Sequence, residues 1–426
     1  MPPAAVSAPL TVAPCPSQLM VDTPDSFIHK PASMTQPAAP LSTPVLAFAL
    51  LIIGTTLGIA GTDLVLPAVP GLPDTLGGSQ AMAQLVLAAF VAGGCVGLVL
   101  YGELGAHFDQ RNLLVLSFIA YAIISLACVL APSLPVLVGL RFAQGLTGSA
   151  AAVFAPGMIR ALFSEARAVH ALGVMASVES LVPALAPVIG VWLLVAFGWK
   201  SSFILIGGLS CVVAALVAML RHRLPPPDPT RGAGSYLRLA TSPVFLRYAL
   251  SQAFTLGGLL IFVFGAPAMI TKGLDGTLND FIIMQVTGIT VFIIGSNVAG
   301  RLADRFGAEP MIVFGTWLSA AGLVALAAYG LVGGTHPLAL AILFVPVNLG
   351  LGLRGPPGFF RAILAANGDD ARGAALVLVA ILSTTAAGTA VAAPFVTLGI
   401  APLAAIAAAV SCGSALCLLA LPKLPG

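Results

Sequence analysis

Long apolar runs dominate the pattern of hydrophobic and polar positions from about residue 44 onward. A helix of about 20 apolar residues crosses the roughly 30 Å hydrocarbon core of a bilayer, and each run reaches that length. Shorter polar or proline-containing segments separate the runs. The pattern therefore predicts twelve transmembrane helices, near residues 44–67, 81–102, 112–131, 135–160, 169–196, 201–221, 245–270, 280–302, 310–331, 337–363, 374–397 and 401–421.

The first 43 residues lack this pattern and are rich in Pro, Ala and Ser. They contain neither the basic region nor the short apolar region of a signal peptide. We expect residues 1–43 to form a disordered cytoplasmic tail.

Composition gives the same protein class. The chain has 426 residues, of which 59% are hydrophobic and 8% are charged. Soluble domains carry about 25% charged residues, so this chain could not cover a water-facing surface. The net charge of +3 is too small to indicate a nucleic-acid partner, and the five scattered histidines indicate no metal site. The fold class is therefore an all-α polytopic membrane protein.

Lys and Arg predict the orientation. If both termini are cytoplasmic, fourteen of the 18 Lys and Arg residues fall on the cytoplasmic side and two on the other. Cytoplasmic loops carry such an excess, so we expect an even number of spans with both termini inside.

The chain also divides into two similar halves. Residues 102–109 follow the second span and 300–307 follow the eighth; residues 155–162 and 356–363 close spans four and ten. Parallel repeats of this kind place a substrate site near the membrane midplane, between the halves. The expected domains are an N-terminal six-helix bundle at 44–221, a cytoplasmic linker at 222–243 and a C-terminal six-helix bundle at 244–422.

Four motifs resemble the major facilitator superfamily, in particular its twelve-span drug:proton antiporters of the Bcr/CflA and chloramphenicol-exporter type. The motifs are Thr62-Asp63-Leu64-Val65-Leu66-Pro67-Ala68-Val69-Pro70 in span one, Arg141-Phe142-Ala143-Gln144-Gly145 in span four, Pro183 to Gly190 in span five, and Gly300 to Gly307 after span eight. The resemblance covers roughly residues 44–422.

The resemblance implies two pseudo-symmetric six-helix bundles and gating roles for Gly102, Arg111, Pro183, Pro187, Gly190, Gly300, Asp304, Arg305 and Gly307. The first copy of the loop motif departs from the family pattern, because Ala106, His107 and Asp109 stand where an acid, an arginine and a glycine are usual. The family's usual charge relay therefore cannot form here, and we expect either different gating at this loop or a biased balance between the conformations.

Charged residues within the spans are the main candidates for chemistry, because each costs about 3 kcal/mol to insert. Asp63 and Arg141 lie at similar predicted depths, so an ion pair between them is expected. The alternative is that Asp63 turns to the outer interface and Arg141 pairs with nothing specific. A basic partner favours the charged carboxylate and apolar surroundings favour the neutral acid, and these opposed influences suit a proton carrier.

Glu179 lies near the middle of span five without a basic residue at its depth. It is a proton-carrying site, a hydrogen-bonding or cation-binding group in the cavity, or a neutral acid that supports helix packing. Arg354 binds an anionic substrate group, pairs with a carboxylate or extends toward the cytoplasm. The proton-coupling candidates are thus Asp63, Glu179 and Arg141. The substrate-binding candidates are Glu179, Arg354, Gln144, Gln252, Asn348 and Phe262.

These features favour a proton-coupled drug or multidrug exporter that works by alternating access. An importer or a metabolite exporter on the same fold is the alternative, and a membrane enzyme or channel fits less well. There is no nucleotide-binding loop, so we expect no cofactor and a proton gradient as the energy source. The expected partners are a small-molecule substrate, protons and the lipid bilayer of a bacterial inner membrane, with no nucleic acid, and the protein is expected to be a monomer.

Overall fold

The computed structural model describes residues 42–225, 234–274 and 276–424, and these residues are helical, without a strand. Within those ranges 12 helices are long and apolar enough to cross a membrane. The predicted fold class and all twelve predicted spans are confirmed. The tail expected at 1–43 falls outside the described residues, except for Ser42 and Thr43, which belong to the first helix.

The helices follow one another in this order: α1 (Ser42–Asp63), η1 (Leu66–Gly71), α2 (Leu72–Leu76), α3 (Gln80–His107), α4 (Gln110–Val129), α5 (Leu134–Gly148), α6 (Ala150–Leu162), α7 (Glu165–Phe197), α8 (Lys200–Leu220), η2 (Arg221–Arg223), α9 (Tyr236–Thr241), α10 (Pro243–Ala268), η3 (Met269–Gly273), α11 (Leu278–Phe306), α12 (Ala308–Leu331), α13 (Pro337–Ala365), α14 (Asp370–Ala392), η4 (Ala393–Leu398) and α15 (Ile400–Ala420). We call α1 to α8 the N-half and α10 to α15 the C-half.

Several helices continue past the apolar runs that predicted them. The helix α3 ends at His107, α7 begins at Glu165 and α14 begins at Asp370. Hydropathy marks where apolar side chains stop, but the backbone stays helical for as long as its polar side chains find partners. The additional turns carry charged residues that join the two halves, as described below.

The first helix ends at Asp63 for a local reason. Pro67 has no N–H to donate to the carbonyl of Asp63, so the α-helical ladder cannot continue. The backbone tightens instead, with Val65 N donating to Thr62 O at 3.2 Å and Ala68 N to Val65 O at 3.0 Å. The carbonyl of Gly61 thereby loses its usual partner in the helix, which matters for Arg141 below.

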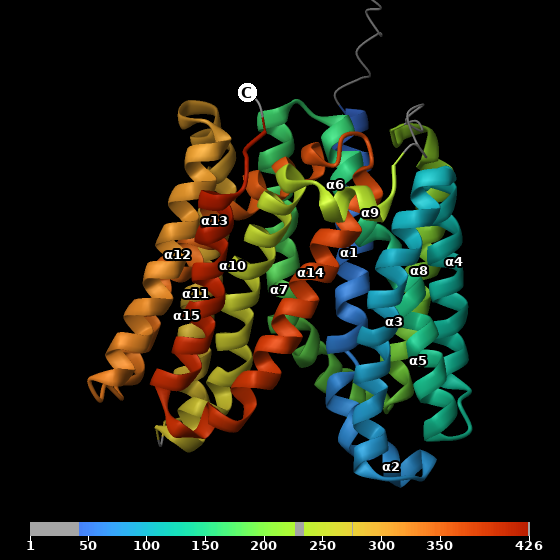
Figure 1. Cartoon of the computed structure of the whole chain (residues 1–426). Helices are drawn as coiled ribbons and strands as arrows, with labels where there is room; N and C mark the ends of the chain where they lie inside the picture. Colours follow the sequence, from blue (N-terminus) through green and yellow to red (C-terminus); the bar gives the residue numbers. More distant parts are fainter. Residues whose placement is uncertain (1–41, 226–233, 275, 425–426) are drawn as a thin grey trace, which may run out of the picture. The chain divides into compact units, whose positions relative to one another are not determined.

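The helices form one compact unit with two distinct ends. Figure 1 shows α9 and the C-terminus at one end and α2 at the opposite end. We call these the linker end and the α2 end. The halves meet where α7 packs against α11 and where α14 packs against α3.

Three clusters of buried apolar side chains hold the helices together. One draws mainly on residues 47–224, and the other two lie between residues 239 and 418. Ring contacts within them include Phe262 against Phe344, with centroids 5.5 Å apart. The helix faces outside these clusters carry exposed apolar side chains such as Ile123, Val195 and Leu419, as expected of surfaces that contact lipid.

Arg247 fastens three C-half helices together at the linker end. Its side chain on α10 is only 6% exposed. It pairs with Glu309 on α12 and donates to the carbonyls of Leu418 and Leu421 at the end of α15, the latter at 2.7 Å. The Tyr248 hydroxyl donates to the second oxygen of Glu309 at 3.0 Å.

Replacing Arg247 with Met should destabilise the folded protein by about 2 kcal/mol, because Glu309 and two carbonyls lose their donor. Thermal unfolding of the purified protein in detergent measures this loss as a lower midpoint. Arg167→Met is the matched control, since Arg167 is exposed. Equal unfolding midpoints for Arg247→Met and Arg167→Met would contradict the role of Arg247 in joining these three helices.

Candidate functional site

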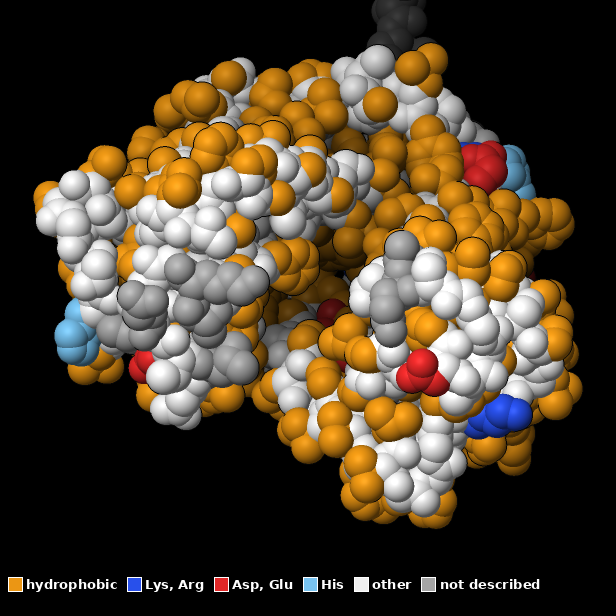
Figure 2. All heavy atoms as spheres, turned by 90° about the horizontal axis from the view of Figure 1, so that it is seen from below, with side chains coloured by type: hydrophobic (Ala, Val, Ile, Leu, Met, Phe, Trp, Pro, Cys, Tyr) orange, Lys and Arg blue, Asp and Glu red, His pale blue; other side chains and the backbone are white. Residues whose placement is uncertain are grey.

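A cavity of about 360 Å³ lies between the two halves. Its wall is apolar over most of its extent, with Met175, Phe292 and Leu382 among the lining residues. Seen from the α2 end, the molecule is hollowed between two groups of helices, and acidic atoms are visible within the hollow (Figure 2). This form suits an amphipathic small molecule.

Glu179 is the charged residue of the cavity lining, and α7 positions it there. Its polar neighbour is the hydroxyl of Thr55 on α1, which also lines the cavity. Thr55 itself donates to the carbonyl of Ile52 at 3.0 Å. No ion pair of Glu179 occurs among the described residues. An acid without a cation in apolar surroundings can change its charge by binding or releasing a proton.

Gln252 faces the same cavity from the C-half. It is 5% exposed, and its Oε1 atom has no hydrogen-bond partner in the described structure. Arg354 lies next to it but is not part of the lining. A Cβ added at Gly358 would come within 3.0 Å of both Gln252 Oε1 and Arg354 Nη2, so this glycine leaves room for both side chains.

Arg354 is fully buried, which corrects the alternative that it extends toward the cytoplasm. Its Nη1 atom donates to the carbonyl of Ser251 at 3.0 Å and its Nη2 atom to the Ser251 hydroxyl at 3.1 Å. A buried cation held by one residue adds positive potential behind Gln252. The C-half wall therefore presents the amide of Gln252 to the cavity that the carboxyl of Glu179 lines from the N-half, and the guanidinium of Arg354 lies behind that wall.

Arg141 is also fully buried, within the N-half. It donates to the free carbonyl of Gly61 at 3.0 Å, to Val86 O at 3.2 Å and to Gln144 Oε1 at 2.6 Å. The ring of Phe90 lies 4.2 Å from its guanidinium carbon. Carbonyl oxygens and an aromatic face thus replace the expected carboxylate, and Arg141 caps the end of α1.

The expected ion pair between Asp63 and Arg141 is not formed. Arg141 nevertheless lies at the same level of the N-half as Asp63, because it bonds the carbonyl of Gly61, two residues before Asp63. The carboxylate of Asp63 is partly exposed at the end of α1 and has no ion pair in the described part of the chain. Asp63 therefore lies outside both the Arg141 network and the cavity lining.

Three other predicted substrate residues lie outside the cavity lining. Gln144 joins Arg141 to the Ser125 hydroxyl, which accepts a 2.7 Å bond from Gln144 Nε2. Asn348 donates to the carbonyl of Phe344 at 3.0 Å, and Phe262 packs within the C-half core. Their proposed contact with substrate stays a prediction that the cavity does not support.

Charged residues close the linker end by joining the halves. Arg160 on α6 pairs with Asp370 on α14 at 2.6 Å. Arg361 on α13 pairs with Glu165 on α7 at 3.2 Å. The two pairs are related by the internal repeat, because Arg160 and Arg361 occupy matching positions at the ends of spans four and ten.

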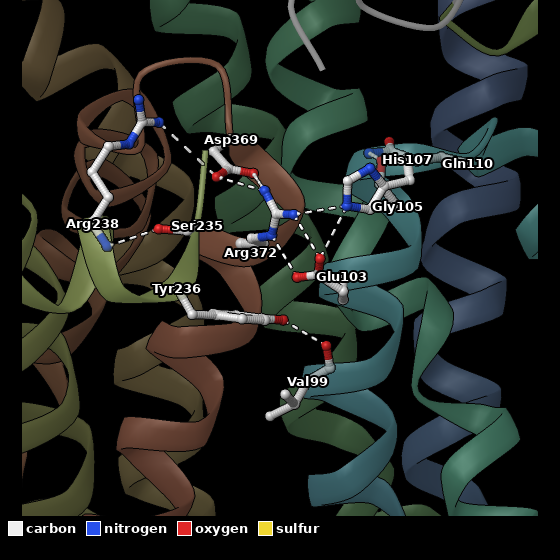
Figure 3. A network of polar contacts seen from close by, with 10 residues as sticks. All are labelled: Val99, Glu103, Gly105, His107, Gln110, Ser235, Tyr236, Arg238, Asp369 and Arg372. Atoms are coloured by element: carbon white, nitrogen blue, oxygen red, sulfur yellow. Dashed lines mark hydrogen bonds and ion pairs between the residues drawn. The ribbon is translucent and has the colours of Figure 1, made fainter. Parts of the chain in front are cut away.

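A third ion pair between the halves joins Arg372 to Glu103 (Figure 3). Arg372 on α14, 2% exposed, holds both oxygens of Glu103 on α3, at 2.7 and 2.8 Å, and also pairs with Asp369 at 3.1 Å. His107 Nε2 lies 3.0 Å from Glu103 Oε1 and 3.2 Å from Arg372 Nη2. We call these three ion pairs the linker-end gate.

The gate explains how the unusual first loop still makes contact between the halves. Glu103, directly after Gly102, provides the acid that Ala106 cannot. Asp109 instead caps α4, accepting from Arg111 N at 3.0 Å, and pairs with the Arg111 side chain at 2.8 Å. Arg111 is thus a local residue of the α3–α4 turn in this conformation.

The second loop is arranged differently. A Cβ at Gly300 would lie 3.0 Å from the Cβ of His170, so this glycine permits the close contact of α11 with α7. Asp304 and Arg305 are exposed, and Gly307 adopts a φ of +89° that favours glycine in the turn before α12.

The predicted span-five motif lies against the end of α1. A Cβ at Gly190 would come within 2.5 Å of the carbonyl of Leu64 and 3.2 Å of Pro67. Pro183 is exposed and Pro187 is partly buried, both inside the continuous helix α7. Gly190 therefore permits the close packing of α7 against the residues that follow α1, whereas neither proline is among the residues that line the cavity.

Sequence analysis missed Glu103, Arg372, Asp370 and the linker residue Tyr236. The first three lie just beyond the ends of the predicted spans at 81–102 and 374–397, so they are not among the charges within the spans. The sequence contains a signal that could have found two of the ion pairs. Arg160 and Arg361 close spans four and ten, and Asp370 and Glu165 stand at the start of the following span in the opposite half.

Replacing Arg141 with Met should destabilise the N-half by several kcal/mol, because each buried acceptor left unpaired costs about 1–3 kcal/mol. Arg141→Lys keeps the charge but not the forked set of donors, so its stability should lie between those of Arg141→Met and the unmodified protein. The measurement is the thermal unfolding midpoint in detergent, with hydrogen exchange of residues 60–70 as the local reading. Unchanged exchange there in Arg141→Met would rule out the capping role.

Comparisons with known proteins show what this chain is similar to. The family model described as Major Facilitator Superfamily matches residues 51–391. The bicyclomycin resistance protein homolog of Haemophilus influenzae is 27% identical over 299 residues, which cover 67% of this chain and 73% of that protein. The chloramphenicol resistance protein of Pseudomonas aeruginosa is 27% identical over 274 residues, which cover 63% of this chain and 64% of that protein.

One solved structure with a similar fold is the proton:xylose symporter XylE bound to 6-bromo-6-deoxy-D-glucose. Its TM-score is 0.69 at 15% identity, over 88% of this chain and 95% of that chain. At this identity the likeness concerns the fold alone. The family match extends over most of the chain and confirms the resemblance inferred from the motifs: the chain belongs to the Major Facilitator Superfamily of membrane transporters.

Proposed function

We propose that the protein is a proton-coupled exporter of small amphipathic compounds, a drug or multidrug:proton antiporter. The main support is Glu179, a carboxyl without an ion pair in the described structure, on the wall of an otherwise apolar cavity between the halves. The printed names of the two bacterial relatives, which concern bicyclomycin and chloramphenicol resistance, favour export of such compounds. No cofactor is part of the proposal.

In the proposed orientation the linker end faces the cytoplasm of a bacterial cell and the protein spans its inner membrane. An excess of basic residues at that end, which is typical of cytoplasmic loops, supports this orientation. The basic residues at the linker end include Arg111, Arg160, Arg221, Arg223, Arg238, Arg247, Arg305, Arg361 and Arg372. Both termini then lie inside, and the protein works as a monomer.

The working units of the proposal are two six-helix bundles, at 44–221 and 244–422, joined by the linker at 222–243. The separation of the buried clusters near residue 224 favours this division. The ion pairs of the linker-end gate join side chains rather than a continuous apolar core, so they can separate as the bundles rock.

The transport cycle begins with the linker end closed and the cavity reached from the opposite side. Glu179 binds a proton there and becomes neutral. Rocking of the bundles then breaks the gate and exposes the cavity to the cytoplasm, where Glu179 releases its proton and an amphipathic compound binds. Because proton and compound compete for the same state, their flows are coupled in opposite directions.

The remaining polar groups have supporting roles in the cycle. Gln252, with Arg354 behind it, orients polar atoms of the bound compound from the C-half wall. Asp63 is a second proton-binding acid at the outer end of α1, and Arg141 holds that end in place. Each unit charge carried across the membrane is worth about 2.3 kcal/mol per 100 mV, which is the driving force available.

Glu179→Gln should abolish drug efflux driven by a proton gradient, since the amide cannot release a proton, while the protein stays folded. Everted membrane vesicles with a fluorescent lipophilic dye measure this directly. Asp74→Asn, which removes an exposed acid of α2, is the matched control and should transport normally. Normal transport by Glu179→Gln would refute its role, and Asp63→Asn tests the second acid in the same assay.

Arg160→Asp should favour the state that is open at the linker end, because it places a second carboxylate beside Asp370. Adding Asp370→Arg restores an opposite pair and should recover most of the lost efflux. Two measurements test this: dye efflux from vesicles, and hydrogen exchange of residues 157–163. A double variant no better than Arg160→Asp alone would show that the pair does not act as part of a gate.

A further inference from the structure

The short linker helix α9 is packed against both halves at once. Leu239, 2% exposed, lies in a C-half cluster with Phe245 and Tyr248. Tyr236, one turn earlier, packs against the N-half cluster instead. A segment that serves only as a tether needs neither contact, so the linker has a role in how the halves meet.

Tyr236 makes a specific bond to the N-half. Its hydroxyl donates to the carbonyl of Val99 on α3 at 2.6 Å (Figure 3). Burial, with Glu103 nearby as a second cause, holds the pKa of the Tyr236 phenol above its ordinary value. The hydroxyl therefore keeps its proton and remains a donor.

A glycine makes room for this tyrosine. A Cβ added at Gly102 would collide with the Tyr236 hydroxyl and would lie 2.9 Å from the Cβ of Ala375 on α14. Gly102 thus creates a notch that the linker and α14 share. This gives the glycine of the first loop motif a contact that sequence alone did not reveal.

The remaining contacts of α9 reach the linker-end gate. The Ser235 hydroxyl caps α9 by accepting from Arg238 N at 3.1 Å. Arg238 lies 4.0 Å from Asp369, which itself pairs with Arg372. The guanidinium carbon of Arg372 lies 5.9 Å from the centre of the Tyr236 ring. The linker therefore supports the side of the gate formed by α14.

We propose that α9 is a clasp that holds the linker end closed, with Leu239 fixing it to the C-half and Tyr236 fastening it in the Gly102 notch of the N-half. Opening of the linker end requires Tyr236 to leave Val99 and Gly102, because α9 moves with the C-half. The clasp rests on the proposed alternating-access function, and it makes the linker a determinant of which end is open.

Tyr236→Phe tests the clasp by removing one hydroxyl. A typical hydrogen bond of this kind should shift the balance between closed and open states by about two- to tenfold toward open. Hydrogen exchange of the full-length protein in lipid nanodiscs, without substrate, measures the shift as faster exchange in residues 99–107 and 369–376. Gly102→Ala, which fills the notch, should act in the same direction.

Thr241→Ala is the matched control, because among the described residues its hydroxyl bonds within α9, to the carbonyls of Leu237 and Arg238. It should exchange like the unmodified protein. Exchange in residues 320–331 of α12, which lie beyond the cluster that Leu239 shares with Ile312, reports whether each variant is folded. Unchanged exchange at 99–107 in both Tyr236→Phe and Gly102→Ala would overturn the clasp. Absence of proton-driven efflux by the unmodified protein would instead refute the proposed function, since the exchange assay involves no transport.

Discussion

A charged side chain inside a membrane must be compensated, and this constraint accounts for most of the polar structure of the protein. Arg141 and Arg354 are fully buried, and carbonyl and hydroxyl oxygens compensate their charges instead of carboxylates. Arg247 is compensated by Glu309 and the end of α15. Among the described residues, Glu179 has no ion pair, and its hydrogen-bonding neighbour is the hydroxyl of Thr55. This difference from the three arginines is the reason for proposing Glu179 as the proton site.

The linker end obeys a second constraint, since contacts that must separate cannot be a continuous apolar core. Side-chain ion pairs with partial exposure suit this purpose, because water can replace each partner when the halves part. Arg160 with Asp370 and Arg361 with Glu165 occupy related positions in the two halves. Glu103 with Arg372 is a third pair between the halves and has no counterpart in the second loop, where Asp304 and Arg305 are exposed. The gate therefore follows the internal symmetry only in part.

Apolar run length predicted the twelve helices, because the bilayer thickness sets that length. The depth of Glu179 and Arg141 followed from the helical rise. The partner of Arg141 could not be predicted in this way. It is the backbone carbonyl of Gly61, which lacks its helical partner because the helix ends before Pro67, and a search for opposite charges does not find carbonyls. Sequence analysis missed the gate because hydropathy ends each span at its last apolar residue. In the structure α3 continues to His107, whereas α7 already begins at Glu165 and α14 at Asp370. Tyr236 was hidden in a segment read only as a linker.

The competition between proton and compound at Glu179 is the central claim, and proton release on binding tests it most directly. Purified protein in weakly buffered detergent solution is mixed with a lipophilic test compound while a pH indicator reports free protons. We expect the unmodified protein to release protons when the compound binds, and Glu179→Gln to bind without releasing them. Equal release from both proteins, or binding by the unmodified protein without any release, would contradict the proposed coupling.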